Sequence, residues 1–180
     1  ISTNTLTRQK LVDFSLTTWV DGASFIVNPA VSSARKLADL NGKKIGVITG
    51  TTTERAIADI AKRDYLSLEL VAMKNHVEGL NALQGGKIDA YSSDQAVLIG
   101  LAFAVRDQFQ VLIGEQLFSY EPYGLAMRRS DPDFRLAVNT VIAGIMRSGQ
   151  IREVYDRWFG KLGKPSPLLL AVWATNGLPE

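Results

Sequence analysis

Three consecutive threonines, Thr51, Thr52 and Thr53, lie between a predicted strand and a predicted helix in the run "GVITGTTTERA". Thr51 and Glu54 have the spacing of a capping box, in which two side chains bond to amides at a helix start. The free amides and the dipole of a helix start also attract an anion. The run lacks the lysine of a Walker loop and the repeated glycines of a dinucleotide site, which favours a carboxylate over a phosphate. Thr51 is therefore either a helix cap alone or a cap that also contacts a ligand, and Thr52 is a further candidate contact.

Two other reactive side chains follow strands of the same predicted sheet. Asp94 follows the run "IDAYSS", and its carboxylate suits an ammonium group; the alternative is a cap for the helix that starts at Gln95. His76, the only histidine, follows a predicted strand that ends at Met73. A lone histidine is more often a structural side chain than a ligand contact. Open α/β sheets, however, bind ligands at the carboxyl ends of their strands, and we expect both residues at that edge.

The elements that position these residues alternate between strands and helices. The predicted strands are residues 44–48, 68–73, 88–92 and 109–113. The predicted helices between them are residues 52–63, 76–84 and 95–106. This alternation predicts an α/β fold with a mostly parallel sheet, helices on both faces and right-handed crossovers.

The segments on either side of this unit have a different pattern. Residues 10–17 and 24–28 have strand-like composition and lead to Pro29, and the chain returns to other elements near residue 119. The simplest layout is one lobe inserted within another. We predict an inserted lobe of residues 29–118 and an outer lobe made of residues 1–28 and 119–180.

Two amphipathic helices are predicted in the C-terminal third. Asp131 and Pro132 start the first, whose apolar stripe comprises Phe134, Val138, Val141, Ile142 and Ile145. The second ends at Gly160. The tail beyond Gly160 has proline and glycine punctuation and shows no clear period.

Composition excludes several classes of function. The 180 residues are 46% apolar and 21% charged with a net charge of only +2, which gives little support for a nucleic-acid or anionic-membrane partner. The chain has no cysteine, so disulfides and thiolate metal sites are excluded. No apolar run approaches the roughly 20 residues that span a bilayer. The first residue is Ile1, from which we expect that a signal peptide or more of the protein has been removed.

Five runs resemble, in the same order, segments of the extracellular solute-binding proteins for polar amino acids, the binding components of ABC transporters. They are "STNTLTRQKLVDFS", "GTTTE", "ALQGGKIDAYSSD", "YGLAMRRSDPDF" and "GQIREVYDRWFG". The resemblance implies a two-lobe, type II periplasmic-binding-protein-like fold whose lobes close on an amino acid by a hinge. It implies that Arg8 pairs with the ligand's α-carboxylate, that Thr3 and Thr52 donate hydrogen bonds, and that Asp94 takes the α-ammonium.

The run "MKNHVEG" is similar to the part of glutamate- and aspartate-binding members where a histidine contacts the ligand's side-chain carboxylate. An acidic amino acid is therefore the expected ligand, with His76 as donor. The family implies an ABC permease as partner, a periplasmic location, no cofactor, no metal and no catalysis. The family's first strands and helix precede the "STNT" segment, so the resemblance also implies an incomplete lobe 1 and a chain open to self-association.

Two alternatives share this scaffold. One is an enzyme similar to cyclohexadienyl dehydratase, in which a carboxyl group in the cleft acts as a general acid. An aspartate at position 94 suits ammonium binding, whereas a glutamate there would favour proton donation. The other is the sensor module of a receptor or channel, which is disfavoured because no membrane segment follows the last of the five runs.

Overall fold

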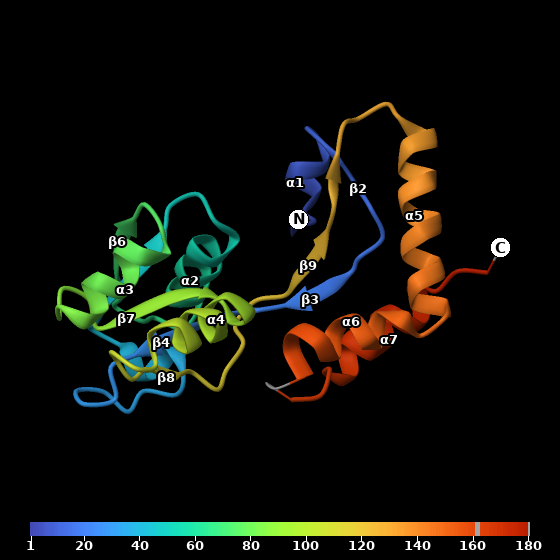
Figure 1. The fold of residues 1–180 in the computed structure, drawn as a ribbon. Helices are drawn as coiled ribbons and strands as arrows, with labels where there is room; N and C mark the ends of the chain where they lie inside the picture. The colour runs from blue at the N-terminus through green and yellow to red at the C-terminus, as the bar shows by residue number, and fades with distance from the viewer. Residues whose placement is uncertain (161–162, 180) are drawn as a thin grey trace. The chain divides into compact units, whose positions relative to one another are not determined.

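The computed structural model describes residues 1–160 and 163–179. The chain divides into two compact units (Figure 1). Unit 1 comprises residues 1–20 and 121–180, and unit 2 comprises residues 21–120. Among the described residues, no helix is both long enough and apolar enough to cross a membrane.

A five-stranded sheet forms the centre of unit 2, in the order β6-β5-β7-β4-β8. β5 is parallel to both β6 and β7, whereas β4 is antiparallel to β7 and β8. The strands are β4 (Ala23–Val27), β5 (Lys44–Ile48), β6 (Glu69–Met73), β7 (Ala90–Asp94) and β8 (Leu112–Ile113).

The position of β4 differs from the sequence-based layout, which assigned residues 1–28 to the outer lobe. β4 pairs along its whole length with β7, from Ala23 opposite Asp94 to Val27 opposite Ala90. All five residues of β4 are buried, because the strand lies inside the sheet with cores on both faces. The first boundary between the units therefore falls at Val20/Asp21 instead of 28/29, and the second at Tyr120/Glu121 instead of 118/119.

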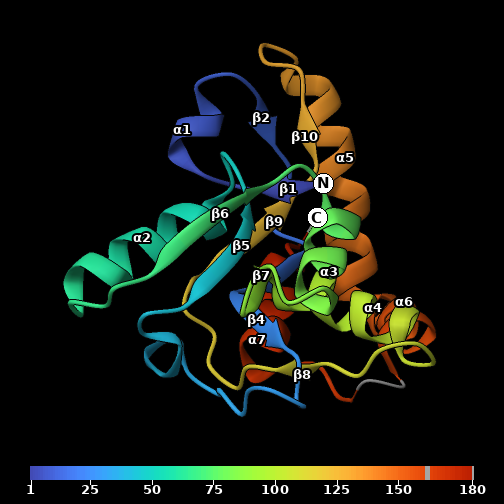
Figure 2. The same ribbon diagram turned by 90° about the vertical axis from the view of Figure 1, so that its left-hand side faces the viewer.

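Helices cover both faces of this sheet. Figure 2 shows α2 on one side of the strands and α3 and α4 on the other. Along β4, Phe25 and Val27 pack into the core beside α2, whereas Ile26 packs into the opposite core with Tyr91. This alternation is the period of two expected of a strand buried on both faces. The helices of unit 2 are η1 (Leu37–Leu40), α2 (Thr52–Arg63), α3 (His76–Gln84) and α4 (Gln95–Val105).

Unit 1 consists of short strands and helices. One sheet has the order β1-β9-β3, and β10 pairs antiparallel with β2. The strands are β1 (Ser2–Thr3), β2 (Asp13–Phe14), β3 (Trp19–Asp21), β9 (Glu121–Gly124) and β10 (Ala126–Met127). The helices are α1 (Leu6–Gln9), α5 (Pro132–Arg147), α6 (Gln150–Phe159) and α7 (Pro167–Asn176).

Aromatic side chains from three elements form the core of unit 1. The ring of Trp19 stacks on Tyr155 of α6, and Tyr155 meets Trp173 of α7 edge-on. The indole nitrogen of Trp173 also donates to the Thr18 carbonyl at 3.0 Å. Helix α7 lies in the tail, where the sequence showed no clear period; Ser166 caps it by accepting a hydrogen bond from the Leu169 amide.

The apolar stripe predicted for α5 is only partly covered. Ile142 packs into the core with Met146, but Phe134 is 54% exposed and Val141 is 62% exposed. The stripe therefore predicts the presence of the helix correctly, but it does not predict which of the stripe residues are buried within this chain.

Candidate functional site

The parallel strands of unit 2 bring four predicted site residues to one edge of the sheet. β5, β6 and β7 run in the same direction, and Ile48 is in register with Met73. Each strand is followed by a helix, so the starts of α2, α3 and α4 lie at the carboxyl ends of the strands. Thr51, Thr52, His76 and Asp94 all belong to these helix starts.

Thr51 caps α2. Its hydroxyl accepts a hydrogen bond from the Glu54 amide at 3.2 Å and donates to the Ile48 carbonyl at 2.7 Å. The Glu54 carboxylate accepts from the amide of Gly50 at 2.7 Å, one residue earlier than in a capping box. The left-handed backbone of Gly50 (φ +79°) turns the chain from β5 into the helix. The capping interpretation of Thr51 thus has a geometric basis, and Thr52 follows as a half-buried residue in the first turn.

Thr53 contacts the predicted ammonium-binding carboxylate. Its buried hydroxyl donates to Asp94 Oδ1 at 3.2 Å, which joins the start of α2 to the end of β7. Sequence reasoning noted Thr53 within the threonine run but did not select it. Thr53 is the buried member of the run, whereas Thr51 and Thr52 are half-buried.

Asp94 occupies the N-cap position of α4, but its side chain does not cap the helix. Among the described residues, its side chain makes no capping hydrogen bond to the start of that helix. The buried Asp21 takes this part: its Oδ2 accepts from the Ala96 amide at 3.0 Å, and its Oδ1 accepts from the Gly22 amide at 2.9 Å. The alternative interpretation of Asp94 as a helix cap is thus right about its position, but the carboxylate that bonds to the first turn of α4 is that of Asp21.

His76 forms a specific hydrogen bond inside unit 2. Its Nδ1 lies 2.8 Å from the phenol oxygen of Tyr91, and the two rings meet edge-on. Tyr91 is fully buried on β7, and burial raises the pKa of its phenol to about 12. His76 itself is half-buried at the first position of α3. Sequence reasoning missed Tyr91, which lies within the run "IDAYSS" three residues before Asp94.

Thr3 and Arg8 lie together in unit 1. Thr3 is buried in β1, and Arg8 belongs to the short helix α1, which Thr5 caps. Arg8 Nη1 donates to the Thr3 carbonyl and to the Ser2 hydroxyl, both at 2.9 Å. These two bonds use one of the three nitrogens of a guanidinium, whose other nitrogens carry further donors. The six predicted residues therefore form two groups: Thr3 and Arg8 in unit 1, and the other four in unit 2.

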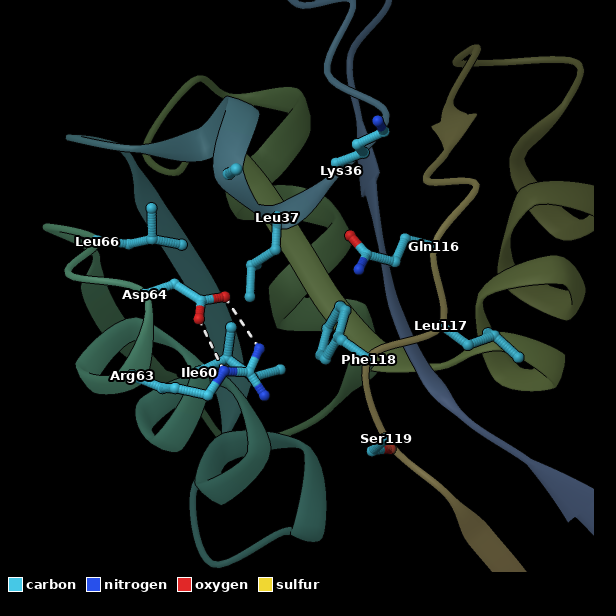
Figure 3. A pocket seen from close by; sticks show the side chains of 11 residues that line it. Lys36, Leu37, Ile60, Arg63, Asp64, Leu66, Gln116, Leu117, Phe118 and Ser119 are labelled. Carbon is cyan, nitrogen blue, oxygen red and sulfur yellow. Dashed lines mark hydrogen bonds and ion pairs between the residues drawn. The ribbon is translucent and has the colours of Figure 1, made fainter.

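A surface pocket of about 550 Å³ also lies within unit 2, and none of the six predicted residues lines it (Figure 3). The end of α2 forms one side, with an ion pair between Arg63 and Asp64, and the segment that contains Gln116 and Phe118 forms the other. Because Asp64 already neutralises Arg63, the lining does not select one class of ligand.

The family of the chain follows from its sequence. The model of the bacterial extracellular solute-binding proteins, family 3, matches residues 2–161. The chain belongs to this family. The predicted type II periplasmic-binding-protein-like α/β fold is thereby confirmed, and solved structures of amino-acid-binding proteins support it.

Several relatives of this family-3 chain have named ligands. An L-glutamate/L-aspartate-binding protein of Pseudomonas aeruginosa is 28% identical over 169 residues, which cover 94% of this chain and 56% of that protein. The structure of an ancestral arginine-binding protein bound to arginine is 30% identical with a TM-score of 0.75, covering 88% of this chain and 69% of that one. An ancestral amino acid-binding protein, a precursor of cyclohexadienyl dehydratase, is 28% identical with a TM-score of 0.71, covering 88% and 65%. The chain spans about half the length of the curated relatives it matches.

Proposed function

We propose that this family-3 chain binds a free α-amino acid and does not transform it. The observation that carries the proposal is the hydrogen bond from Thr53, which fixes the Asp94 carboxylate beside the first turn of α2. The capping bond to the first turn of α4 is made by Asp21 instead. A carboxylate fixed in this way suits the α-ammonium group of an amino acid. The ligands named for two of the relatives, glutamate/aspartate and arginine, support this assignment.

The α-carboxylate is the part of the ligand that we assign to Arg8 and the hydroxyl groups. A guanidinium matches a carboxylate geometrically and can bind both of its oxygens, and charge-assisted hydrogen bonds are about twice as strong as neutral ones. The bonds from Arg8 Nη1 to Ser2 and Thr3 hold the guanidinium close to β1. Thr3, Thr52 and, in addition to its capping bonds, Thr51 are the neutral contacts that we propose.

An acidic side chain is the specificity that we propose, with His76 as the donor to the distal carboxylate. The glutamate/aspartate-binding relative supports this choice, and the arginine-bound ancestral structure is the competing precedent. Calorimetric titration with glutamate, aspartate, glutamine, histidine and arginine decides between them. We expect glutamate or aspartate to bind with about micromolar affinity, about −8 kcal/mol. A preference for arginine would contradict the acidic specificity, and no detectable binding of any of the five amino acids would contradict the binding function.

Catalysis is the alternative to be tested on the same protein. The solved relative that is a precursor of cyclohexadienyl dehydratase is itself described as an amino acid-binding protein, which supports binding. We expect no product when the chain is incubated with prephenate or arogenate. Release of phenylpyruvate or phenylalanine would instead identify a dehydratase.

Delivery of the amino acid to an ABC permease is the role that we propose in the cell, with the periplasm as the location. The family's description as extracellular supports this placement. We expect osmotic shock of the native cells to release the protein in the periplasmic fraction. Retention in the cytosolic fraction would contradict the transport role.

Self-association is proposed through the exposed apolar side of α5. Phe134 and Val141 lie seven positions apart on the helix, about two turns, and both are more than half exposed. A second copy of the chain is the partner that we propose for this surface. Light scattering with size-exclusion chromatography should show a dimer that Phe134→Ser weakens and the exposed control Val31→Ser does not. A monomer at all concentrations would contradict the proposal.

A further inference from the structure

The hydrogen bond between His76 and Tyr91 joins a half-buried helix start to the centre of the sheet. Tyr91 lies on β7, between β5 and β4, and has no exposed surface. Its phenol reaches His76 Nδ1 at 2.8 Å. A buried hydroxyl that lacked this partner would lose its hydrogen bond and retain the cost of desolvation. The bond thus couples the ring orientation of His76 to a rigid side chain.

Two glycines make room for the Tyr91 ring. A Cβ on Gly79 of α3 would lie only 2.2 Å from Tyr91 Cε2, and a Cβ on Gly46 of β5 would lie 3.3 Å from Tyr91 Cδ2. Gly79 is three residues after His76, so both lie on the same side of α3. The ring therefore passes against the bare backbone at Gly79 and ends at the imidazole, which leaves little freedom for a different bond.

The direction of the bond follows from the burial of the phenol and from its single hydrogen-bond partner. Burial raises the pKa of Tyr91 to about 12, so the hydroxyl keeps its proton at neutral pH. Among the described residues, Nδ1 of His76 is the one hydrogen-bond partner of this buried phenol, so the phenol proton needs Nδ1 as its acceptor. An imidazole that accepts at Nδ1 carries its proton at Nε2, because neutral histidine has one donor and one acceptor nitrogen.

We propose that Tyr91 is a positioning residue that fixes His76 as the Nε2–H tautomer, so that the imidazole presents a hydrogen-bond donor to the ligand's side chain. The contact between His76 and a ligand rests on the proposed amino-acid-binding function, whereas the tautomer of His76 does not. A donor at this position selects side chains that end in an acceptor oxygen, such as glutamate, aspartate or glutamine. It opposes ammonium and guanidinium side chains, because they offer only donors.

The tautomer is measured without any ligand. Since His76 is the only histidine, long-range proton–nitrogen NMR spectra of the labelled protein contain one imidazole. We expect the Nδ1 shift of an unprotonated acceptor and the Nε2 shift of a protonated donor at neutral pH. In Tyr91→Phe, which keeps the ring in place and removes the hydroxyl, we expect the shifts of a tautomer mixture. A wild-type Nδ1–H tautomer would overturn the inference.

The second readout is selectivity. Losing one ordered hydrogen bond should lower the ratio of the arginine to the glutamate dissociation constant about three- to tenfold in Tyr91→Phe. The matched control Tyr155→Phe removes a phenol from a buried tyrosine of unit 1, where it is expected to change neither readout. If Tyr91→Phe alters stability but leaves tautomer and selectivity unchanged, Tyr91 is only a packing residue. If the wild type binds no amino acid, the proposed function fails, while the tautomer spectra still decide the inference.

Discussion

Thr53 donates a hydrogen bond of 3.2 Å to Asp94 Oδ1, which joins the first turn of α2 to the last residue of β7. The donor is buried, whereas the acceptor is half-buried. The bond orients one carboxylate oxygen at the edge of the sheet before any ligand arrives. Orientation of this kind raises affinity because less conformational freedom is lost on binding.

Removal of the Thr53 hydroxyl should therefore weaken ligand binding. Thr53→Val keeps the shape of the side chain and is expected to lose about 1 kcal/mol of binding free energy, roughly fivefold in affinity. Calorimetric titration with glutamate measures the change. The control Thr140→Val removes a hydroxyl that bonds to the Leu136 carbonyl on an exposed turn of α5, and should have no effect. Unaltered affinity in Thr53→Val would show that the bond does not serve the ligand.

Substitution of Asp21 should mainly lower stability, whereas substitution of Asp94 should mainly abolish ligand binding. Asp21→Ala removes the side chain that accepts from the Ala96 amide, and should lower the free energy of unfolding by about 1 kcal/mol, as loss of a helix cap does. Asp94→Asn should abolish binding and cost less stability than Asp21→Ala, because its carboxylate makes no capping hydrogen bond to α4 among the described residues. Urea unfolding measures the first effect and calorimetry the second. Equal losses of stability in both variants would contradict this division.

The sequence was informative where local signals determine the element. The predicted bounds of β5, α2 and α3 agree with the structure, because a capping residue, an apolar period and a Gly-containing turn mark their ends. The placement of Thr51, His76 and Asp94 at helix starts followed from these bounds and from the parallel order of the strands. The cap of α4 could not be predicted, because Asp21 is 75 residues away along the chain from Ala96.

Helix α7 was missed because its sequence lacks a polar face. In "PLLLAVWATN" apolar residues occur all around the helix, so no stripe of period 3.6 can be recognised. The remaining signal was Ser166 followed by Pro167, a cap and a first-turn proline. The contact between Tyr91 and His76 could not be predicted from the sequence either, because it depends on Gly79 lacking a side chain where α3 packs against Tyr91.

Gly79 and Gly100 should respond oppositely to alanine, although both are inside helices. A Cβ on Gly79 would overlap the Tyr91 ring, whereas a Cβ on Gly100 of α4 meets nothing within 4 Å among the described residues. Gly79→Ala should destabilise unit 2 by about 1–3 kcal/mol, because overpacking displaces a buried ring. Gly100→Ala should stabilise by up to about 1 kcal/mol through helix propensity. Urea unfolding of the two variants tests the contrast, and stabilisation by both would show that the Tyr91 ring moves freely.

Arg8→Lys should weaken binding although it keeps the positive charge. Arg8 Nη1 bonds to both Ser2 and Thr3, and a lysine ammonium cannot hold these positions and also bind both oxygens of a carboxylate. We expect a loss of about 2 kcal/mol, roughly 30-fold in the affinity for glutamate. The control Arg152→Lys changes an exposed arginine of α6 and should leave affinity unaltered. Equal affinity in wild type and Arg8→Lys would remove Arg8 from the site.

Alkaline unfolding should report the burial of Tyr91. The folded state raises the pKa of its phenol to about 12, whereas a tyrosine in the unfolded chain titrates near about 10. Between these values the unfolded state binds fewer protons, so the free energy of unfolding falls as the pH rises from about 10 towards 12. The stabilising contribution is complete below about pH 10.

Tyr91→Phe should lack this component, so its free energy of unfolding, measured with urea, should decline less steeply between about pH 9 and about pH 11.5. Burial also raises the pKa of Tyr155, so part of the decline should persist in that variant and disappear in the double variant with Tyr155→Phe. Identical declines in wild type and Tyr91→Phe would show that the phenol is solvated in the folded protein, and its hydrogen bond to His76 would then not be fixed by burial.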